Sequence, residues 1–177
     1  MLEPLPEYRT RKIVIGTTLR KPKAVLEHYL ASLAWQTLPP QTELVPCFVD
    51  DGLAPDALEL VKQWVFARGG VVANGEPSPP GDFTDTHAVT HQWSETAMQR
   101  VGRHKTGIIQ WALEQRADAV WFVDADLICD RTTLLSLIHA NRPIACAVYW
   151  THWQRSPQPD LVVHAGPQVW LNHPYDL

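Results

Sequence analysis

The sequence predicts an α/β fold in which helices cover a mostly parallel β-sheet, and three observations support this class. First, short apolar runs alternate with longer segments of helical periodicity between residues 12 and 73, which is the pattern of strands joined by crossover helices. Second, the apolar runs are continuous, as in parallel strands that are covered on both faces. Third, Asp, Gly and Thr residues directly follow several runs, where open α/β sheets bind their ligands.

The first half of the chain contains three predicted strands with a helix between each pair. In chain order, these strands and helices are predicted at 12–18, 22–36, 44–49, 54–68 and 71–73. Pro39 and Pro40 close the first helix, because proline lacks the amide hydrogen that continues a helix. Gly69 and Gly70 end the second helix, since glycine readily adopts the conformation found just beyond a helix terminus.

The second half follows an irregular, proline-containing segment at 76–92, and such a long segment is commonly functional or mobile. Ser94 then predicts the N-cap of a helix that runs to about Gln115, with Gly102 as a point where it could break. The remaining elements are predicted as a strand at 120–126, a helix at 131–140 and strands at 144–150, 161–163 and 169–171.

Size and composition are those of one globular domain, predicted to span residues 1–177. The formal net charge of -4 argues against a nucleic-acid partner, because such a partner requires a basic face. No apolar stretch reaches the roughly 18 residues of a transmembrane segment. Three widely spaced cysteines without metal-site spacing indicate free thiols in a reducing compartment. We therefore expect a cytoplasmic protein, and a membrane-peripheral position is compatible with the same features.

The most informative motif is Asp124-Ala125-Asp126, at the end of the predicted strand 120–126. A buried strand delivers its last residues to the rim of the sheet, so both carboxylates are expected there. Carboxylate oxygens are preferred ligands of Mg²⁺ and Mn²⁺, and the motif therefore predicts a metal site of Asp124 and Asp126 that could hold a diphosphate. The alternative is structural: Asp124 caps a turn and Asp126 is solvated.

A second acidic motif, Asp50-Asp51-Gly52, follows the predicted strand 44–49. Its carboxylates could accept hydrogen bonds from a nucleotide base or from a ribose hydroxyl. Asp and Gly are also common in simple turns between a strand and a helix. Both interpretations of this motif are retained.

Two smaller groups of residues are further candidates for nucleotide binding. Thr17 and Thr18 end the first strand, where their hydroxyl or backbone groups could touch a nucleotide, and Arg20 and Lys21 follow near the mouth. In the long helix after the irregular segment, Arg103 and Lys105 could face a diphosphate. A solvated helix face is the other explanation for these basic residues.

Three segments, taken in their order and spacing, resemble GT-A glycosyltransferases, close to the family 2 type: residues 13–18, 48–52 and 122–126. The resemblance covers roughly Lys12 to Trp150. It implies a Rossmann-like GT-A fold that binds nucleotide-diphospho-sugars. By this resemblance, residues 1–126 are the nucleotide-binding part and 127–177 begin the acceptor-side part.

The resemblance also implies site roles and a reaction. Asp50 or Asp51 would contact the base, Asp124 the ribose or sugar, and Asp126 a Mn²⁺ or Mg²⁺ ion. The implied reaction is metal-dependent transfer of a sugar from a nucleotide-diphospho-sugar to an acceptor hydroxyl. That acceptor could be a sugar, a lipid-linked compound or a small molecule.

Two departures from the family pattern keep alternatives open. Where family members often carry Arg-Asn-x-Gly, this chain has His104-Lys105-Thr106-Gly107. Only about fifty residues follow Asp126, so we expect a truncated acceptor half and nominate no general base. The alternatives are a non-catalytic or incomplete nucleotide-sugar-binding module and a sugar-1-phosphate nucleotidyltransferase. The latter class typically has a Gly-rich loop after the first strand, and residues 16–20 lack that glycine density.

Overall fold

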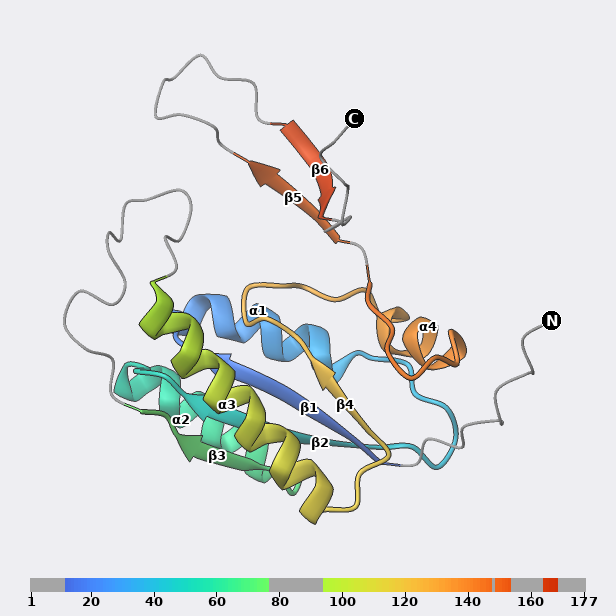
Figure 1. Ribbon diagram of the computed structural model, residues 1–177, viewed down its shortest axis with the longest axis horizontal. Coiled ribbons are helices and arrows are strands. Elements are labelled where there is room, and N and C mark those ends of the chain that lie inside the picture. Colours follow the sequence, from blue (N-terminus) through green and yellow to red (C-terminus); the bar gives the residue numbers. More distant parts are fainter. Residues whose placement is uncertain (1–11, 77–93, 148, 154–163, 169–177) are drawn as a thin grey trace.

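The computed structural model describes residues 12–76, 94–147, 149–153 and 164–168. Within them, one sheet has four parallel strands in the order β3-β2-β1-β4, and a second sheet pairs β5 with β6 (Figure 1). The strands are β1 (Lys12–Leu19), β2 (Glu43–Asp50), β3 (Val71–Asn74), β4 (Ala119–Phe122), β5 (Tyr149–Trp153) and β6 (His164–Gln168). The helices are α1 (Lys23–Ala34), α2 (Pro55–Phe66), α3 (Glu95–Glu114) and α4 (Thr133–His139). The predicted α/β class with a mostly parallel sheet is confirmed.

Helices cover both faces of the parallel sheet, with α1 and α2 on one face and α3 on the other (Figure 1). Successive side chains of a strand point to opposite faces. In β1, Ile13 and Ile15 belong to the core under α1 and α2, whereas Val14 packs with Ile108 of α3. Because both sets are buried, β1 has the continuous apolar sequence of a central parallel strand.

Helix α3 is continuous, and Gly102 does not break it. Its N-terminus is capped as predicted, because the Ser94 hydroxyl accepts a hydrogen bond of 3.0 Å from the Ala97 amide. α3 packs on β1 at Gly16, where an added Cβ would lie 2.7 Å from Cγ2 of Ile108. The missing side chain of Gly16 therefore lets α3 approach the centre of the sheet.

Strand β4 is shorter and less buried than the predicted strand at 120–126. In the described sheet it pairs with β1 alone, and it ends at Phe122, whose side chain is 37% exposed. Beyond β4, burial alternates: Val123 and Ala125 are buried, whereas Asp124 and Asp126 are exposed. The expectation of a strand covered on both faces is wrong here, because an outer strand packs closely on one face only.

The predicted strand at 144–150 is wrong in its first part. Residues 144–147 form no strand, and Ile144 is 91% exposed. Strand β5 begins later and pairs antiparallel with β6, outside the parallel sheet. The predicted strands at 161–163 and 169–171 lie outside the described residues. An apolar run can indicate a strand, but it does not specify which strand will be its partner.

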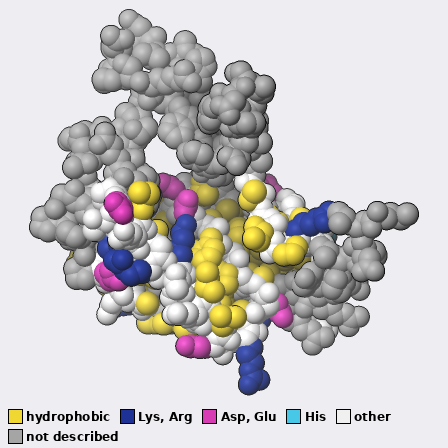
Figure 2. Space-filling model, in the orientation of Figure 1, with side chains coloured by type: hydrophobic (Ala, Val, Ile, Leu, Met, Phe, Trp, Pro, Cys, Tyr) yellow, Lys and Arg dark blue, Asp and Glu magenta, His cyan; other side chains and the backbone are white. Residues whose placement is uncertain are grey.

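The surface around α3 and β4 carries several exposed apolar side chains, among them Met98, Ile109, Leu113 and Phe122. Figure 2 shows hydrophobic side chains gathered over this face. Among the described residues, no helix combines the length and apolar character that crossing a bilayer requires.

Candidate functional site

The four parallel strands end at one edge of the sheet, and the candidate site lies at that edge. The chain reaches β2 and β3 on one side of β1, and then returns through α3 to β4 on the other side. Ligands of open α/β sheets bind where the strand order reverses in this way. The segments that follow the strands form the rim of the site: residues 20–21, 51–53, 75–76 and 123–126.

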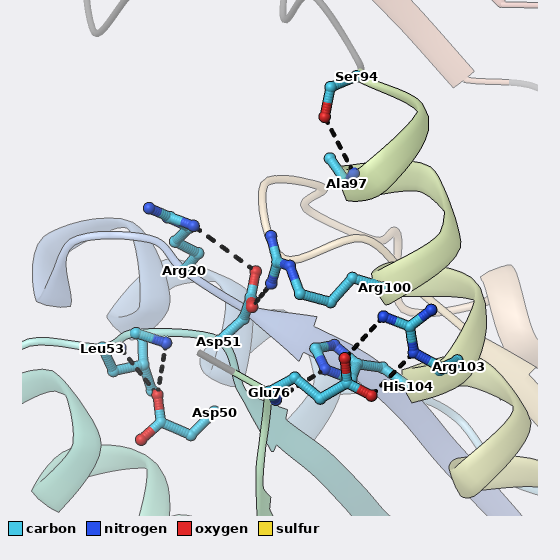
Figure 3. Close-up of polar contacts among 11 residues, drawn as sticks. Arg20, Asp50, Asp51, Leu53, Glu76, Ser94, Ala97, Arg100, Arg103 and His104 are labelled. Carbon is cyan, nitrogen blue, oxygen red and sulfur yellow. Dashed lines mark hydrogen bonds and ion pairs between the residues drawn. The ribbon is translucent and has the colours of Figure 1, made fainter. Parts of the chain in front are cut away.

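The two adjacent acids at the end of β2, Asp50 and Asp51, make different contacts. Asp50 Oδ1 accepts hydrogen bonds from the backbone amides of Gly52 (3.0 Å) and Leu53 (2.8 Å), so this side chain stabilises the turn into α2. Gly52 has a φ of 99°, a conformation that glycine adopts without strain. Asp51 turns toward α3 instead and is only 6% exposed (Figure 3).

Asp51 lies between two arginines from distant parts of the chain (Figure 3). Arg100 of α3 is 1% exposed, and its guanidinium donates a hydrogen bond to Asp51 Oδ1. Nη1 of Arg20, just after β1, lies 4.0 Å from Asp51 Oδ2. Burial and the nearby charges of Arg20 and Arg103 lower the pKa of Arg100. The buried acid is thus neutralised from both sides.

A second ion pair lies beside the first, at the end of β3. Arg103 Nε and Nη2 donate to the two carboxylate oxygens of Glu76 at 2.8 and 2.7 Å. This bidentate pair is half-exposed on the rim and holds the pKa of Glu76 below its usual range. Arg103, which the sequence assigned to a diphosphate, is therefore engaged by an acid of the chain itself.

His104 is the buried neighbour of this pair, and its imidazole is only 7% exposed. Its Nε2 accepts a hydrogen bond of 3.1 Å from the Glu76 amide, which places the proton of a neutral ring on Nδ1. Among the described residues, that buried Nδ1 has no hydrogen-bond partner. Burial, and then the charge of Arg100, lower the pKa of His104, so the ring is held neutral.

The loop that carries Asp124 and Asp126 is held by hydrogen bonds to β1 and α1. The Val123 amide donates to the Gly16 carbonyl at 3.2 Å, and the Tyr29 hydroxyl donates to the Val123 carbonyl at 3.3 Å. Burial raises the pKa of Tyr29, and the charges of Asp124 and Asp126 act in the same direction. Asp124 and Asp126 thus follow β4 at the carboxyl edge of the sheet, in a loop tied to β1 and α1.

Asp126 already has a cationic partner. Nζ of Lys21 lies 2.7 Å from Asp126 Oδ2, and the two side chains are 29% and 52% exposed. Lys21 follows β1 and precedes α1, so the pair links the segments that follow the neighbouring strands β1 and β4. Sequence proximity did not indicate it, because 105 positions of the chain separate the partners.

The remaining candidate residues differ in their burial and in their contacts. Thr17 is buried and hydrogen-bonds to Tyr29, whereas Thr18 is half-buried on the α3 side of β1. Nζ of Lys105 lies 5.7 Å from the centre of the Phe122 ring, within the range of a cation–π contact.

Three residues of the rim were noticed in the sequence but not selected as site residues: Lys21, Arg100 and His104. Two of them had a usable signal, because Arg100, His104 and Ile108 recur every four residues and such residues share one helix face. Ile108 is apolar and buried, so the same face would carry the other two inward. The position of Lys21 after the first strand placed it near the mouth, but nothing in the sequence indicated its pairing with Asp126.

The rim offers two kinds of chemistry. Around Asp51, buried charges are balanced and rigid, which suits hydrogen-bonded recognition. At Asp124 and Asp126, exposed carboxylates offer the hard oxygen donors that Mg²⁺ and Mn²⁺ prefer. Among the described residues, no group of three or more His, Cys, Asp or Glu side chains is placed to hold a metal ion. Two protein carboxylates fit a metal whose other ligands are water and diphosphate oxygens.

The described part is thus an α/β protein with a Rossmann-like parallel sheet and a charged site at the carboxyl edge of that sheet. No protein-family model and no curated protein matches the chain. Among solved structures, it is similar to S. aureus TarS 1-349, over 71% of this chain and 30% of that chain, at 20% identity and a TM-score of 0.47.

Two further solved structures are similar to the chain. The mannosyltransferase PcManGT from Pyrobaculum calidifontis, in complex with GDP-Man and Mn²⁺, matches over 77% of this chain and 34% of that chain, at 20% identity and a TM-score of 0.46. TarS 1-349 in complex with UDP matches at 21% identity and a TM-score of 0.45. The chain spans about a third of the length of these proteins.

Proposed function

We propose that this chain binds a nucleotide-diphospho-sugar together with Mn²⁺ or Mg²⁺ and belongs to a glycosyltransferase. One observation carries the proposal: the loop with Asp124 and Asp126 and the turn with Asp51 lie on the same edge of the sheet, on either side of β1. A nucleotide that lies across this edge would meet the turn with its base and the loop with its diphosphate.

Each residue then has a role that suits its surroundings. Asp51, held by Arg100, offers an oriented acceptor for base N–H groups, as the family resemblance implies. Asp124 would accept from a ribose or sugar hydroxyl, and Asp126 would ligate the metal. Thr18 and Arg20 adjoin the path between them and would contact the nucleotide, while Asp50 and Gly52 shape the turn.

The basic residues would bind the negative end of the donor. Arg103 would release Glu76 and bind a phosphate in its place. Lys105 lies beside Phe122 of β4, the strand that leads into Asp124. When bound, Mn²⁺ or Mg²⁺ would neutralise the charge that builds up on the departing diphosphate. The protein's own part is to hold donor and metal in one orientation, from a loop anchored on β1 and α1.

Isothermal titration calorimetry with UDP, GDP and dTDP in the presence of MnCl₂ tests the binding proposal. We expect one nucleotide to bind and the Asp126→Asn substitution to weaken that binding at least about ten-fold, the effect of 1.4 kcal/mol. The control is Asp118→Asn, which removes the same charge at the opposite edge of the sheet, where Asp118 Oδ2 accepts from the Lys12 amide. Binding that Asp126→Asn leaves unchanged would refute the proposal.

Analysis of the reaction products distinguishes a glycosyltransferase from a nucleotidyltransferase and from a binding module. Release of free sugar and nucleoside diphosphate from the matching donor indicates a transferase, because water replaces the acceptor slowly in such sites. Release of pyrophosphate from a nucleoside triphosphate and a sugar-1-phosphate indicates a nucleotidyltransferase instead. Tight donor binding without either product indicates a binding module.

A further inference from the structure

The Lys21–Asp126 ion pair occupies the carboxylate that the proposed metal would need. The 2.7 Å separation of Nζ and Oδ2 is that of a direct charge-assisted hydrogen bond. A carboxylate has acceptor sites for both groups, but a divalent cation and an ammonium group held so close together repel each other. The proposed metal therefore competes with a side chain of the protein.

The backbone around Asp126 is fixed, so Lys21 is the partner that would move. Ala125 is buried, the Leu127 amide donates to the Asp124 carbonyl at 3.1 Å, and the Cys129 amide donates to the Ser32 hydroxyl at 3.3 Å. Lysine, in contrast, has a flexible four-carbon stem and a strongly hydrated charge. A partly exposed pair of this kind is weak, and a divalent cation can displace it.

We infer that Lys21 is a built-in counter-ion that holds Asp126 in the metal-free protein and transfers to the donor's diphosphate when the divalent cation binds. This inference rests on the proposed function. Lys21 follows β1 at the same edge of the sheet, so a released ammonium group would remain beside the negatively charged donor. Metal and nucleotide would then bind cooperatively, because each removes part of the obstacle to the other.

Mn²⁺ binding tests the inference without measuring activity. Free Mn²⁺ is quantified by electron paramagnetic resonance for the wild type, Lys21→Met, Lys21→Arg and Lys23→Met, with Mn²⁺ alone and with Mn²⁺ plus the nucleoside diphosphate that binds. Lys23 is the matched control, because it is exposed two residues further on at the start of α1. Lys21→Arg keeps the charge and the ion pair.

With Mn²⁺ alone, we expect Lys21→Met to bind the ion about two- to five-fold more tightly than the wild type, which is the strength of an exposed ion pair. Lys23→Met and Lys21→Arg should bind like the wild type. With the nucleoside diphosphate present, the advantage of Lys21→Met should vanish or reverse, because the diphosphate loses its lysine.

Three results would overturn the inference: unchanged, weaker or undetectable Mn²⁺ binding by Lys21→Met, an equal gain in Lys23→Met, or a gain that the nucleotide does not reduce. The proposed function fails separately. It fails if the wild type binds no nucleoside diphosphate with Mn²⁺, or if Asp126→Asn binds it equally well.

Discussion

At the scale of single residues, Asp51 shows how a candidate ligand can also be part of the packing. Its carboxylate is buried, and burying a charge without a partner costs several kcal/mol. Arg20, just after β1, and Arg100, on α3, supply the compensating positive charge. The same ion pair that orients Asp51 therefore also holds α3 against the rim.

Replacing Arg100 by methionine should destabilise the fold, because the apolar chain keeps the volume but leaves Asp51 with less compensation. We expect a loss of about 3 kcal/mol in the free energy of unfolding, measured by urea denaturation. Arg103→Met is the control, because it removes an arginine one turn further along α3 from a half-exposed pair. Equal losses for both variants would show that the buried ion pair contributes no more to stability than the half-exposed one.

His104 should make stability depend on pH. Burial lowers its pKa in the folded protein below the ordinary value of 6.5, so the unfolded chain takes up a proton first as pH falls. The free energy of unfolding should be highest above pH 6.5 and decrease below it, until the folded form is also protonated. The slope in this window should not exceed about 1.4 kcal/mol per pH unit.

Denaturation curves between pH 5.5 and 8 measure this effect as the difference between the wild type and His104→Gln. The substitution should flatten the dependence, whereas His28→Gln, on the exposed side of α1, should not. A wild-type dependence that persists in His104→Gln would assign it to other groups.

At the scale of elements, the contact between α3 and β1 decides where the basic residues lie. Gly16 permits this contact, and Ile108 fills the space above it. Four and eight residues earlier on the same face of α3 stand His104 and Arg100, which reach the rim for that reason. The position of the charged cluster is thus set by an apolar contact deeper in the sheet.

Two glycine substitutions, one in β1 and one in α3, should change the free energy of unfolding in opposite directions. Gly16→Ala places a methyl group 2.7 Å from Ile108 and should cost about 1–3 kcal/mol in unfolding free energy by overpacking. Gly102→Ala, on the exposed side of α3 with no atom near the new methyl, should stabilise by about 0.5–1 kcal/mol through helix propensity. Thermal or urea unfolding measures both, and a neutral Gly16→Ala would contradict the close packing.

The elements also show where local sequence patterns are sufficient. Helix α3 and its Ser94 cap follow from signals within a few residues of each other, and the prediction was right. The run at 144–150 is apolar too, yet residues 144–147 form no strand and β5 pairs in a second sheet. Strand pairing depends on partners far along the chain, which a local pattern does not specify.

At the scale of the whole molecule, ligand binding should be visible as added stability. A ligand at 100 times its dissociation constant adds about 2.7 kcal/mol to the free energy of unfolding. We expect this gain from Mn²⁺ and nucleoside diphosphate together and a clearly smaller gain from either alone, measured as the shift in thermal midpoint. In Asp126→Asn the joint gain should fall to that of the nucleotide alone.

Asp118→Asn is again the control, because its site lies at the amino edge of the sheet. A full joint gain in Asp126→Asn would place the metal elsewhere. A joint gain that merely equals the sum of the separate gains would remove the evidence for cooperative binding, without touching the site itself.

The sequence by itself determined the α/β class, the parallel direction of the main strands and the edge at which acidic residues gather. These properties depend on periodicity and on residues that directly follow a strand, both of which are local. It also identified Asp51, Asp124 and Asp126 as candidates, although it left open which acid of Asp50-Asp51 forms the turn.

Only the tertiary structure decided how those charges are paired. Asp51 meets Arg100 across 49 positions of the chain, Glu76 meets Arg103 across 27, and Asp126 meets Lys21 across 105. Ion pairing depends on distance in space, and the sheet brings together strand ends that are remote in sequence. The physical reason is the crossover through α3, which returns the chain to β1 and places Asp126 beside Lys21.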